Sequence, residues 1–336
     1  MNKTINSFLA ILVVSLLLSC NFNPKKPPSE GETKEKKTIA VKVPEFNPDS
    51  AYSYVVQQLV FGPRVMNFPA HEKCALFLIN KLKSWCQNVT VQKGTVKAYN
   101  GTILNFRNII ASFNPGTNNR IFLCSHWDSR PYADHDPDPK NHNKPIDGAN
   151  DGASGVGILL DIARQISISK PPIGVDIILF DAEDYGPPQD WKSNVNTEDF
   201  WGLGSQYWAN QPHKADYFAK YGILLDMVGA PNATFLMEGI SMHYAPDIVK
   251  LVWETANRIG FSRYFLYDEG GQITDDHIPV NKIRGIPTID IIHLDRNSET
   301  GFYPYWHTTK DNLASIDKAT LNAVGQTLLT VIYNEK

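Results

Sequence analysis

The stretch VDIILFDAED, residues 175–184, joins an apolar run to three acids within four positions. The run is rich in Ile, Val and Leu, which is typical of strands that are buried on both faces of a parallel sheet. Asp181, Glu183 and Asp184 repel one another, and a carboxylate beside a buried strand end also loses hydration. Either water screens these acids on a surface turn, or a cation lies among them.

The rest of the chain extends this strand into an α/β pattern. Further apolar runs predict strands at 102–113, 120–125, 222–228, 234–238 and 286–292. Amphipathic segments predict helices at 70–85, 152–168, 200–210, 245–259 and 317–332. Because strands and helices alternate, the sequence predicts a three-layer sandwich in which helices flank a twisted, mostly parallel central sheet. No strong linker interrupts the pattern, so residues 45–336 are expected to form a single catalytic domain.

The composition is that of an ordinary globular domain, with 42% hydrophobic and 20% charged residues. A formal net charge of −3 gives no electrostatic reason to expect nucleic-acid binding. The four cysteines include no CxxC pair, so a thiolate zinc site is not indicated.

The N-terminal residues 1–20 have the form of a targeting segment. The apolar run at 8–18 is too short to span a bilayer and is typical of a signal-peptide core. Its Leu-Leu-Ser-Cys ending resembles the bacterial lipobox, which implies a lipid on Cys20 that anchors the protein to the cell envelope, facing the periplasm. A secretory signal cut near Ser19 and an uncleaved anchor are the alternatives. Residues 21–44 are rich in Pro, Lys and Glu and are expected to be a disordered tether.

Potential metal ligands follow several predicted strands, and an open α/β sheet binds its ligands at the carboxyl ends of its strands. These residues are His126, Asp128, Asp151, Glu183, Asp184, Asp226, Asp275, Asp276, His277 and His307. Each alone has a simpler interpretation, because an Asp before a helix is commonly an N-cap and an Asp-rich loop is commonly a solvated turn. Several acids that end apolar strands at one sheet edge favour a cation instead.

Carboxylate and imidazole ligands suit zinc, and a catalytic zinc keeps three protein ligands and an open fourth position. Asp151, Asp184 and His307 would supply two oxygens and one nitrogen. Glu183 could then transfer protons while its neighbour Asp184 holds the metal. This is our hypothesis for the acidic pair that follows the strand.

Five motifs in order, SHWDS, GANDGASGVGILLDIAR, LFDAED, LLDMVGAPN and YWHTTKDN, resemble the zinc-dependent M28 peptidase family. The resemblance runs from about residue 64 to the C-terminus and implies a zinc aminopeptidase-like fold. Two activities are associated with this fold. The aminopeptidases use two zinc ions and a bridging water to remove an N-terminal residue. The glutaminyl cyclases use one zinc to close N-terminal Gln into pyroglutamate, and they release ammonia.

Three stretches favour a cyclase. GGQITDDHIP, residues 270–279, resembles a cyclase segment with two consecutive Asp residues. Trp306 precedes His307, and Trp191 lies in the loop after the acidic pair, where cyclases carry tryptophans that line a small pocket. A packing role is the alternative for each Trp. The resemblance therefore implies peptides or proteins that begin with Gln as substrates.

The resemblance also implies a role for each candidate residue. These are one zinc on Asp151, Asp184 and His307, proton transfer by Glu183, an acidic network near the substrate at Asp226 and Asp275, and substrate contacts from Trp191, Trp306 and Asp290. Animal cyclases have His in place of Asp290, Gln in place of Thr274 and Glu in place of Asp184. His126 leaves the two-zinc alternative open, because in the aminopeptidases it would bind a second metal together with Asp226.

Overall fold

The structure is a computed structural model that describes residues 42–192, 194 and 196–336. The expected signal peptide at 1–20 and the tether up to residue 41 lie outside the described residues. Val43 packs against the hydrophobic core, and the Pro44 carbonyl accepts a hydrogen bond from Gln326 Nε2 at 3.3 Å. The last residues of the expected tether therefore belong to the folded domain.

A six-stranded sheet forms the centre of the domain, in the order β1-β2-β4-β3-β5-β8. Its strands are β1 (Val89–Lys97), β2 (Ile103–Phe113), β3 (Arg120–His126), β4 (Gly174–Phe180), β5 (Gly222–Asp226) and β8 (Thr288–Ile292). β4, β3, β5 and β8 run parallel to one another, whereas β1 and β2 are antiparallel additions at one edge. The prediction of a mostly parallel central sheet is confirmed.

The predicted strand at 234–238 lies outside this sheet. It forms β6 (Phe235–Met237), which pairs in parallel with β7 (Phe265–Glu269) in a separate two-stranded sheet. Two strands that we did not predict, β7 and the edge strand β1, therefore contribute to the sheets.

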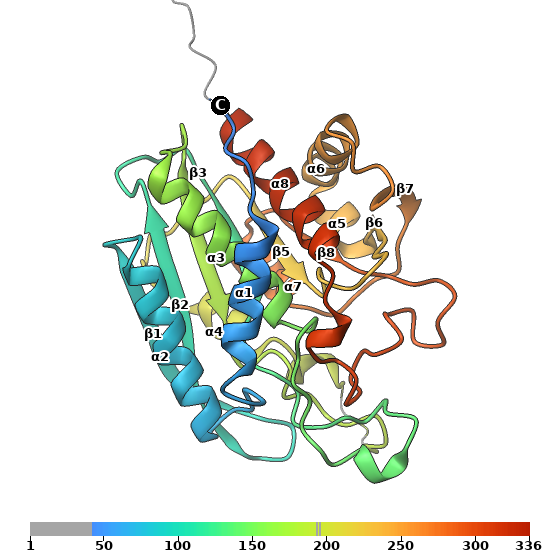
Figure 1. Cartoon of the computed structure of the whole chain (residues 1–336). Coiled ribbons are helices and arrows are strands. Elements are labelled where there is room, and N and C mark those ends of the chain that lie inside the picture. Colours follow the sequence, from blue (N-terminus) through green and yellow to red (C-terminus); the bar gives the residue numbers. More distant parts are fainter. Residues whose placement is uncertain (1–41, 193, 195) are drawn as a thin grey trace, which may run out of the picture. The chain divides into compact units, whose positions relative to one another are not determined.

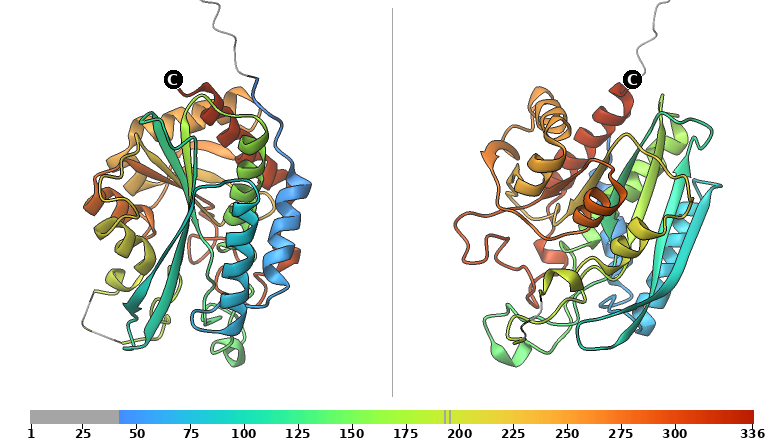
Figure 2. Two further views of the ribbon diagram at one scale, coloured as in Figure 1. Left: turned by 90° about the vertical axis from the view of Figure 1, so that its left-hand side faces the viewer. Right: turned by 180° about the vertical axis from the view of Figure 1, so that it is seen from behind.

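Helices cover both faces of the central sheet (Figures 1 and 2). One face carries α1 (Pro48–Leu59), α2 (Pro69–Lys83), α3 (Ala153–Ile168) and α8 (Lys318–Asn334), and the other carries α4 (Leu203–Asn210) and α7 (His277–Pro279) with the π-helical turn Val280–Arg284. The helices α5 (Gly239–Tyr244) and α6 (Pro246–Arg258) pack near β7 and β8, and short 3-10 turns occupy Pro139–Asn141, Glu198–Phe200 and Leu313–Ser315. The three-layer arrangement agrees with the prediction from sequence.

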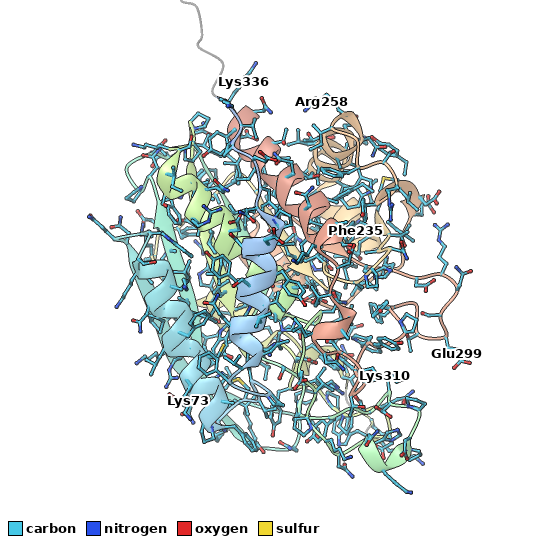
Figure 3. The ribbon with its side chains drawn as sticks, viewed as in Figure 1. Lys73, Phe235, Arg258, Glu299, Lys310 and Lys336 are labelled. Carbon is cyan, nitrogen blue, oxygen red and sulfur yellow. The ribbon has the colours of Figure 1, made fainter. Side chains whose placement is uncertain are left out.

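The alternation of side chains along β4 explains the two cores of the domain. Ile177 and Leu179 pack into the core under α1, α3 and α8, whereas Ile178 and Phe180 pack into the core under α4. Successive strand side chains point to opposite faces, so a strand covered on both sides is mainly apolar. The exception in β4 is Asp176, which is buried and pairs with the Arg120 guanidinium at 2.7 Å. Every residue of β4 is buried. Figure 3 shows how the side chains fill the space between the layers.

Three of the parallel strands end at the same edge of the sheet. β3 ends at His126, β4 ends just before Asp181, and β5 ends at Asp226. The polar loops that follow these strands therefore converge there, as expected for the ligand-binding edge of an open α/β sheet. Among the described residues, no helix is long and apolar enough to cross a membrane.

Candidate functional site

The three acids in the turn after β4 make different contacts. Asp181 faces away from the other two and accepts hydrogen bonds from the backbone N–H groups of Ala182 at 3.0 Å and Arg107 at 2.6 Å. Its carboxylate also lies 2.9 Å from the buried Nε2 of His71. Ala182 has a φ of 57°, a left-handed conformation that is uncommon outside functional sites for a residue with a side chain. Asp181 thus stabilises the turn that presents the next two acids.

Asp128 holds the acidic pair in place. Its Oδ1 accepts a hydrogen bond from the backbone N–H of Glu183 and its Oδ2 accepts one from that of Asp184, both at 3.1 Å. The carboxylate is fully buried, so these two bonds are shielded from water. The sequence suggested Asp128 as a metal ligand. In the structure, its carboxylate instead accepts hydrogen bonds from the backbone of the acidic pair.

Asp151, Asp184 and His307 come together as a buried group suited to a metal ion. His307 Nε2 lies 3.3 Å from Asp184 Oδ1 and 3.5 Å from Asp151 Oδ2. Ligand atoms around a tetrahedral zinc with bonds of about 2.0–2.1 Å are separated by about 3.3 Å, so these spacings fit the ion. The three predicted ligands therefore lie together.

The electrostatics of this group also fit a cation. Burial and the neighbouring charge of Asp151 raise the pKa of Asp184 well above its usual range. Burial and the Arg130 guanidinium lower the pKa of His307 well below its usual range, so its imidazole is neutral and can offer a lone pair. Within the described part of the chain, Asp184 Oδ2 is buried without a hydrogen-bond partner. A divalent ion would satisfy that oxygen and offset the repulsion between the carboxylates.

Hydrogen bonds to the backbone and left-handed backbone conformations position Asp151 and His307, the other two members of the metal group. Asp311 accepts hydrogen bonds from the N–H groups of Asn150 at 2.8 Å and Asp151 at 3.1 Å. Gly152 follows with a φ of 53°, and a Cβ there would lie 2.6 Å from the His126 carbonyl oxygen, so only glycine fits. His307 itself has a φ of 52°. Left-handed residues thus recur at the metal group, where strain is commonly retained for function.

A second buried group shares Asp151. His126 Nε2 lies 3.0 Å from Asp151 Oδ1 and 3.2 Å from Asp226 Oδ1, and the three residues could also surround a metal. These separations are equally those of direct N–H···O hydrogen bonds. The geometry of this group is therefore compatible with a hydrogen-bonded triad or a second ion.

The predicted catalytic acids meet in one cavity of about 500 Å³ beside the metal group. Glu183, Asp226, Asp275 and His307 are among the residues that line it. Burial, followed by the charges of Asp184 and Asp275, raises the pKa of Glu183 well above its usual range. Burial and the charge of Asp151 raise the pKa of Asp226 to about 6, and burial and the charge of Asp226 raise that of Asp275 to about 7. Such values suit groups that exchange protons near neutral pH.

Asp290, which we expected to contact the substrate, is not among the described residues that line this cavity. It lies inside β8, fully buried, and its pKa is raised by burial and then by the charge of Asp275. Its carboxyl group therefore lies near that of Asp275, which lines the cavity.

Two tryptophans form walls of the cavity. The Trp306 ring stacks on His307 with centroids 3.8 Å apart, and Trp201 lies nearly parallel to the same imidazole at 6.2 Å. Trp306 was predicted from sequence, but Trp201 was not. Trp191 is not among the described residues that line the cavity, and it packs edge-on against Tyr99 at 5.3 Å and Phe200 at 5.9 Å. In this loop the cavity wall is Trp201, and Trp191 has a packing position.

Arg130 connects the metal group with this wall, and sequence reasoning missed it. Its guanidinium carbon lies 4.9 Å from the Trp201 ring centre, and its Nη1 lies 3.5 Å from Asp184 Oδ1. The same guanidinium donates two hydrogen bonds to Asp134, at 2.8 and 2.7 Å. The sequence did contain a hint of this role, because the motif SHWDSR places Arg130 four residues after the candidate metal ligand His126.

Comparison with known proteins identifies the family. A sequence profile of peptidase family M28 matches residues 108–332, which contain all the metal-group and cavity acids described above. The chain belongs to peptidase family M28. This M28 chain is 53% identical in sequence to the solved glutaminyl cyclase of Bacteroides thetaiotaomicron bound to N-acetylhistamine, with a TM-score of 0.86 over 88% of this chain and 100% of that one.

Two other relatives bear on the activity of this M28 chain. A solved Zn-dependent exopeptidase from Parabacteroides distasonis is 54% identical, with a TM-score of 0.86 over 87% of this chain and 100% of that one. The glutaminyl-peptide cyclotransferase of Bos taurus is 27% identical over 256 residues, which are 66% of this chain and 64% of that protein. The chain thus spans somewhat less than two thirds of the cattle enzyme. The solved glutaminyl cyclase and the solved exopeptidase are about equally similar to this chain. Overall similarity therefore does not decide between the two reactions, and the residues of the site must be compared with what each reaction needs.

Proposed function

We propose that this protein is a zinc-dependent glutaminyl cyclase, which converts the N-terminal Gln of peptides and proteins into pyroglutamate with release of ammonia. The observation that carries the proposal is the set of residues that line the cavity beside the metal group. The acids Glu183, Asp226 and Asp275, which have raised pKa values, line this cavity together with Trp201 and Trp306, and both tryptophan rings lie nearly parallel to the His307 imidazole. Aromatic side chains beside the metal group suit a site that binds the Gln side chain. Several close structural relatives are glutaminyl cyclases, which supports the same reading.

Asp151, Asp184 and His307 are the residues that would hold the zinc. The proposal takes one zinc per chain, and His126 Nε2 is close enough to Asp151 Oδ1 and to Asp226 Oδ1 to form a hydrogen bond with either carboxylate without an ion. Bound zinc supplies a Lewis acid that polarises the γ-carbonyl of the substrate Gln.

The protein side chains carry out the proton transfers of this mechanism. Glu183 accepts a proton from the substrate α-amine, whose nitrogen forms a bond to Cδ of the Gln side chain. Glu183 then returns the proton to the amide nitrogen, the bond from Cδ to that nitrogen breaks, and ammonia leaves. Asp226 and Asp275 accept hydrogen bonds from the amine and from the leaving group. Trp201 and Trp306 hold the Gln in a folded shape and exclude water, which brings the amine close to the γ-carbonyl.

A two-zinc aminopeptidase is the second candidate. It is favoured by the group of His126, Asp151 and Asp226, which shares Asp151 with the first metal group. It is also favoured by the similarity to the Zn-dependent exopeptidase. In this alternative Glu183 would activate a water molecule for hydrolysis of the first peptide bond.

The products formed from a peptide that begins with Gln separate the two candidates. The cyclase proposal expects a peptide that has lost one ammonia and is otherwise intact, as seen by mass spectrometry. Release of free Gln with a peptide shortened by one residue would refute the cyclase and support the aminopeptidase. The same peptide with N-terminal Ala in place of Gln is the control, because it cannot cyclise but an aminopeptidase can shorten it.

We also propose that a lipid on Cys20 anchors the enzyme to the bacterial cell envelope, facing the periplasm. The support is the resemblance of residues 17–20 to the lipobox and the polar composition of the segment that follows. In cells fed radiolabelled palmitate, the wild-type protein is expected to be labelled and to enter the detergent phase. A Cys20→Ala variant that is equally labelled would contradict this proposal.

A further inference from the structure

One side of the cavity is formed by a single stretch of chain. The consecutive residues Gly271 to Asp275, which we call the cavity segment, all line the cavity, and residues 271–274 belong to no helix or strand. A reacting group on such a segment keeps its place only through bonds to more rigid elements. We propose that Glu238 anchors the cavity segment and thereby positions Asp275 for the reaction. This inference rests on the proposed cyclase function, in which Asp275 accepts a hydrogen bond from the substrate.

The Glu238 carboxylate binds two parts of the chain at once. The residue is fully buried and is the N-cap of α5. Its Oε1 accepts hydrogen bonds from the backbone N–H groups of Ile240 at 2.7 Å and Ile273 at 3.0 Å. Its Oε2 accepts hydrogen bonds from the backbone N–H and the hydroxyl of Ser241. One side chain therefore joins the first turn of α5 to the cavity segment, although Glu238 is not among the described residues that line the cavity.

A backbone contact holds the same two parts of the chain together. The N–H of Gly239 donates to the Gly271 carbonyl at 2.8 Å. A Cβ on Gly239 would lie 3.3 Å from that carbonyl oxygen, so the two backbones approach as closely as glycine allows. The bond from Ile273 to Glu238 lies two residues nearer to Asp275 in the chain. Glu238 therefore extends the backbone contact toward the reacting acid.

The charge of Glu238 strengthens this anchor. Burial raises the pKa of Glu238, but the nearby His277 and the hydrogen bonds from Ser241 and Ile240 outweigh burial and lower the pKa to about 2. His277 Nε2 lies 3.4 Å from Glu238 Oε2. The side chain is therefore a carboxylate at neutral pH, and hydrogen bonds to an ionised acceptor are about twice as strong as those between neutral groups.

Replacing Glu238 by Asp separates its two contacts. Asp is a favoured N-cap residue, so the carboxylate of Glu238→Asp can still accept the N–H groups at the start of α5. Its side chain is shorter by one methylene, about 1.5 Å, so a carboxylate that caps α5 cannot also reach Ile273. The control is Asn47→Ala, which removes the side-chain cap of α1, where Asn47 Oδ1 accepts the Ser50 N–H at 3.0 Å. Asn47 is not among the described residues that line the cavity.

The first measurement is hydrogen–deuterium exchange of the metal-free protein, which does not depend on the reaction. A hydrogen bond to a charged group is strong enough to slow exchange of the donor amide by about tenfold or more. In Glu238→Asp the Ile273 amide, followed in a peptide that spans residues 270–276, should therefore exchange about tenfold faster. The amides of α5 should keep their protection, and Asn47→Ala should leave the Ile273 amide unchanged.

The second measurement is kcat for ammonia release from a Gln peptide at saturating zinc. A displacement of about 1 Å near a reacting group can cost about 10²-fold in rate, so kcat of Glu238→Asp should fall by about 10–100-fold. Zinc affinity should not change, because the three proposed zinc ligands lie outside the cavity segment. Asn47→Ala should keep the wild-type kcat, and circular dichroism checks that both variants are folded.

Each measurement can overturn the inference. Unchanged exchange of the Ile273 amide in Glu238→Asp would show that Glu238 is not the anchor. Wild-type kcat in that variant would show that the anchor does not serve the reaction, and an equal loss of kcat in Asn47→Ala would assign the effect to stability. If the wild-type enzyme releases no ammonia, the proposed cyclase function fails and this role of Glu238 with it, whereas wild-type release with an unaffected variant refutes the inference alone.

Discussion

Replacing Asp128 by Asn should weaken zinc binding even though Asp128 is not among the proposed ligands. Its two carboxylate oxygens each accept one backbone N–H, from Glu183 and from Asp184, at 3.1 Å. The Asn side chain has one acceptor oxygen, and its NH2 group would face the second backbone donor. A buried hydrogen bond to a charged group contributes about 1.5–3 kcal/mol, so the free energy of unfolding of the metal-free protein should fall by about 3 kcal/mol.

The loss of zinc affinity follows from the position of the Asp184 backbone. Outer partners that orient metal ligands typically change affinity by about 10–100-fold when they are mutated, and we expect a decrease of that size for Asp128→Asn. The assay is a zinc titration against a competing fluorescent chelator, with circular dichroism to confirm that the variant is folded.

The matched control is Asp161→Asn. Asp161 is also fully buried, and it accepts the backbone N–H of Asn47 at 3.0 Å and pairs with Arg164 at 2.7 Å. It lies on α3 outside both metal groups. This variant should lose stability but keep wild-type zinc affinity. Equal zinc affinity in Asp128→Asn and the wild type, or an equal decrease in both variants, would show that Asp128 does not position the zinc ligand Asp184.

Three further predictions follow from single contacts. Glu183→Gln should lower kcat by about 10²–10⁴-fold with zinc still bound, as measured by metal analysis of the purified variant, and loss of the metal would instead make Glu183 a ligand. Burial opposes protonation of His71, but attraction to and hydrogen bonding with Asp181 outweigh it and raise its pKa above 6.5. The stabilisation from this pair should be complete below about pH 6.5 and be lost as the pH rises through the folded-state pKa, and urea unfolding of His71→Gln should lack this fall. Trp201→Ala should raise KM for a Gln peptide by about tenfold, whereas Trp191→Ala should leave it unchanged, and the opposite pattern would return Trp191 to the pocket.

The sequence predicted the central strands well because their burial leaves a continuous apolar signal. β4 and β3 are covered on both faces and every residue is buried, so composition alone marked them. β1 reads VTVQKGTVK and is half-buried or exposed along its length, as an edge strand can be, so it carries little apolar signal. The separate pairing of β6 with β7 depends on contacts between segments almost thirty residues apart. Such pairing cannot be read from local pattern.

The site was predicted to the extent that sheet topology determines it. Asp151, Asp184 and His307 were placed together because the carboxyl ends of parallel strands converge at one edge. Asp290 lies in the middle of the five-residue strand β8, not at its end, so its expected role rested on the family resemblance and not on sheet topology. The sequence could not distinguish Trp201 from Trp191, because the direction of a side chain in a long loop depends on tertiary packing.

The cluster of acids after β4 has a simple physical explanation in the folded protein. Asp181 is paired with His71, a residue 110 positions away in the sequence, so its charge does not need the cation. The sequence does not show that Asp181 pairs with His71, so it gives no reason to separate Asp181 from the other two acids. Only Glu183 faces the cavity, and Asp184 belongs to the metal group.

The most direct test of the account is a zinc titration of the metal-free enzyme with simultaneous measurement of ammonia released from a Gln-Phe peptide. A cyclase that binds one zinc through Asp151, Asp184 and His307 predicts that ammonia release rises linearly and stops rising at one zinc per chain. The His126 group would then take no part in activation by zinc. Activity that continues to rise up to two zinc ions per chain, with free Gln as the product, would contradict the account and establish the aminopeptidase.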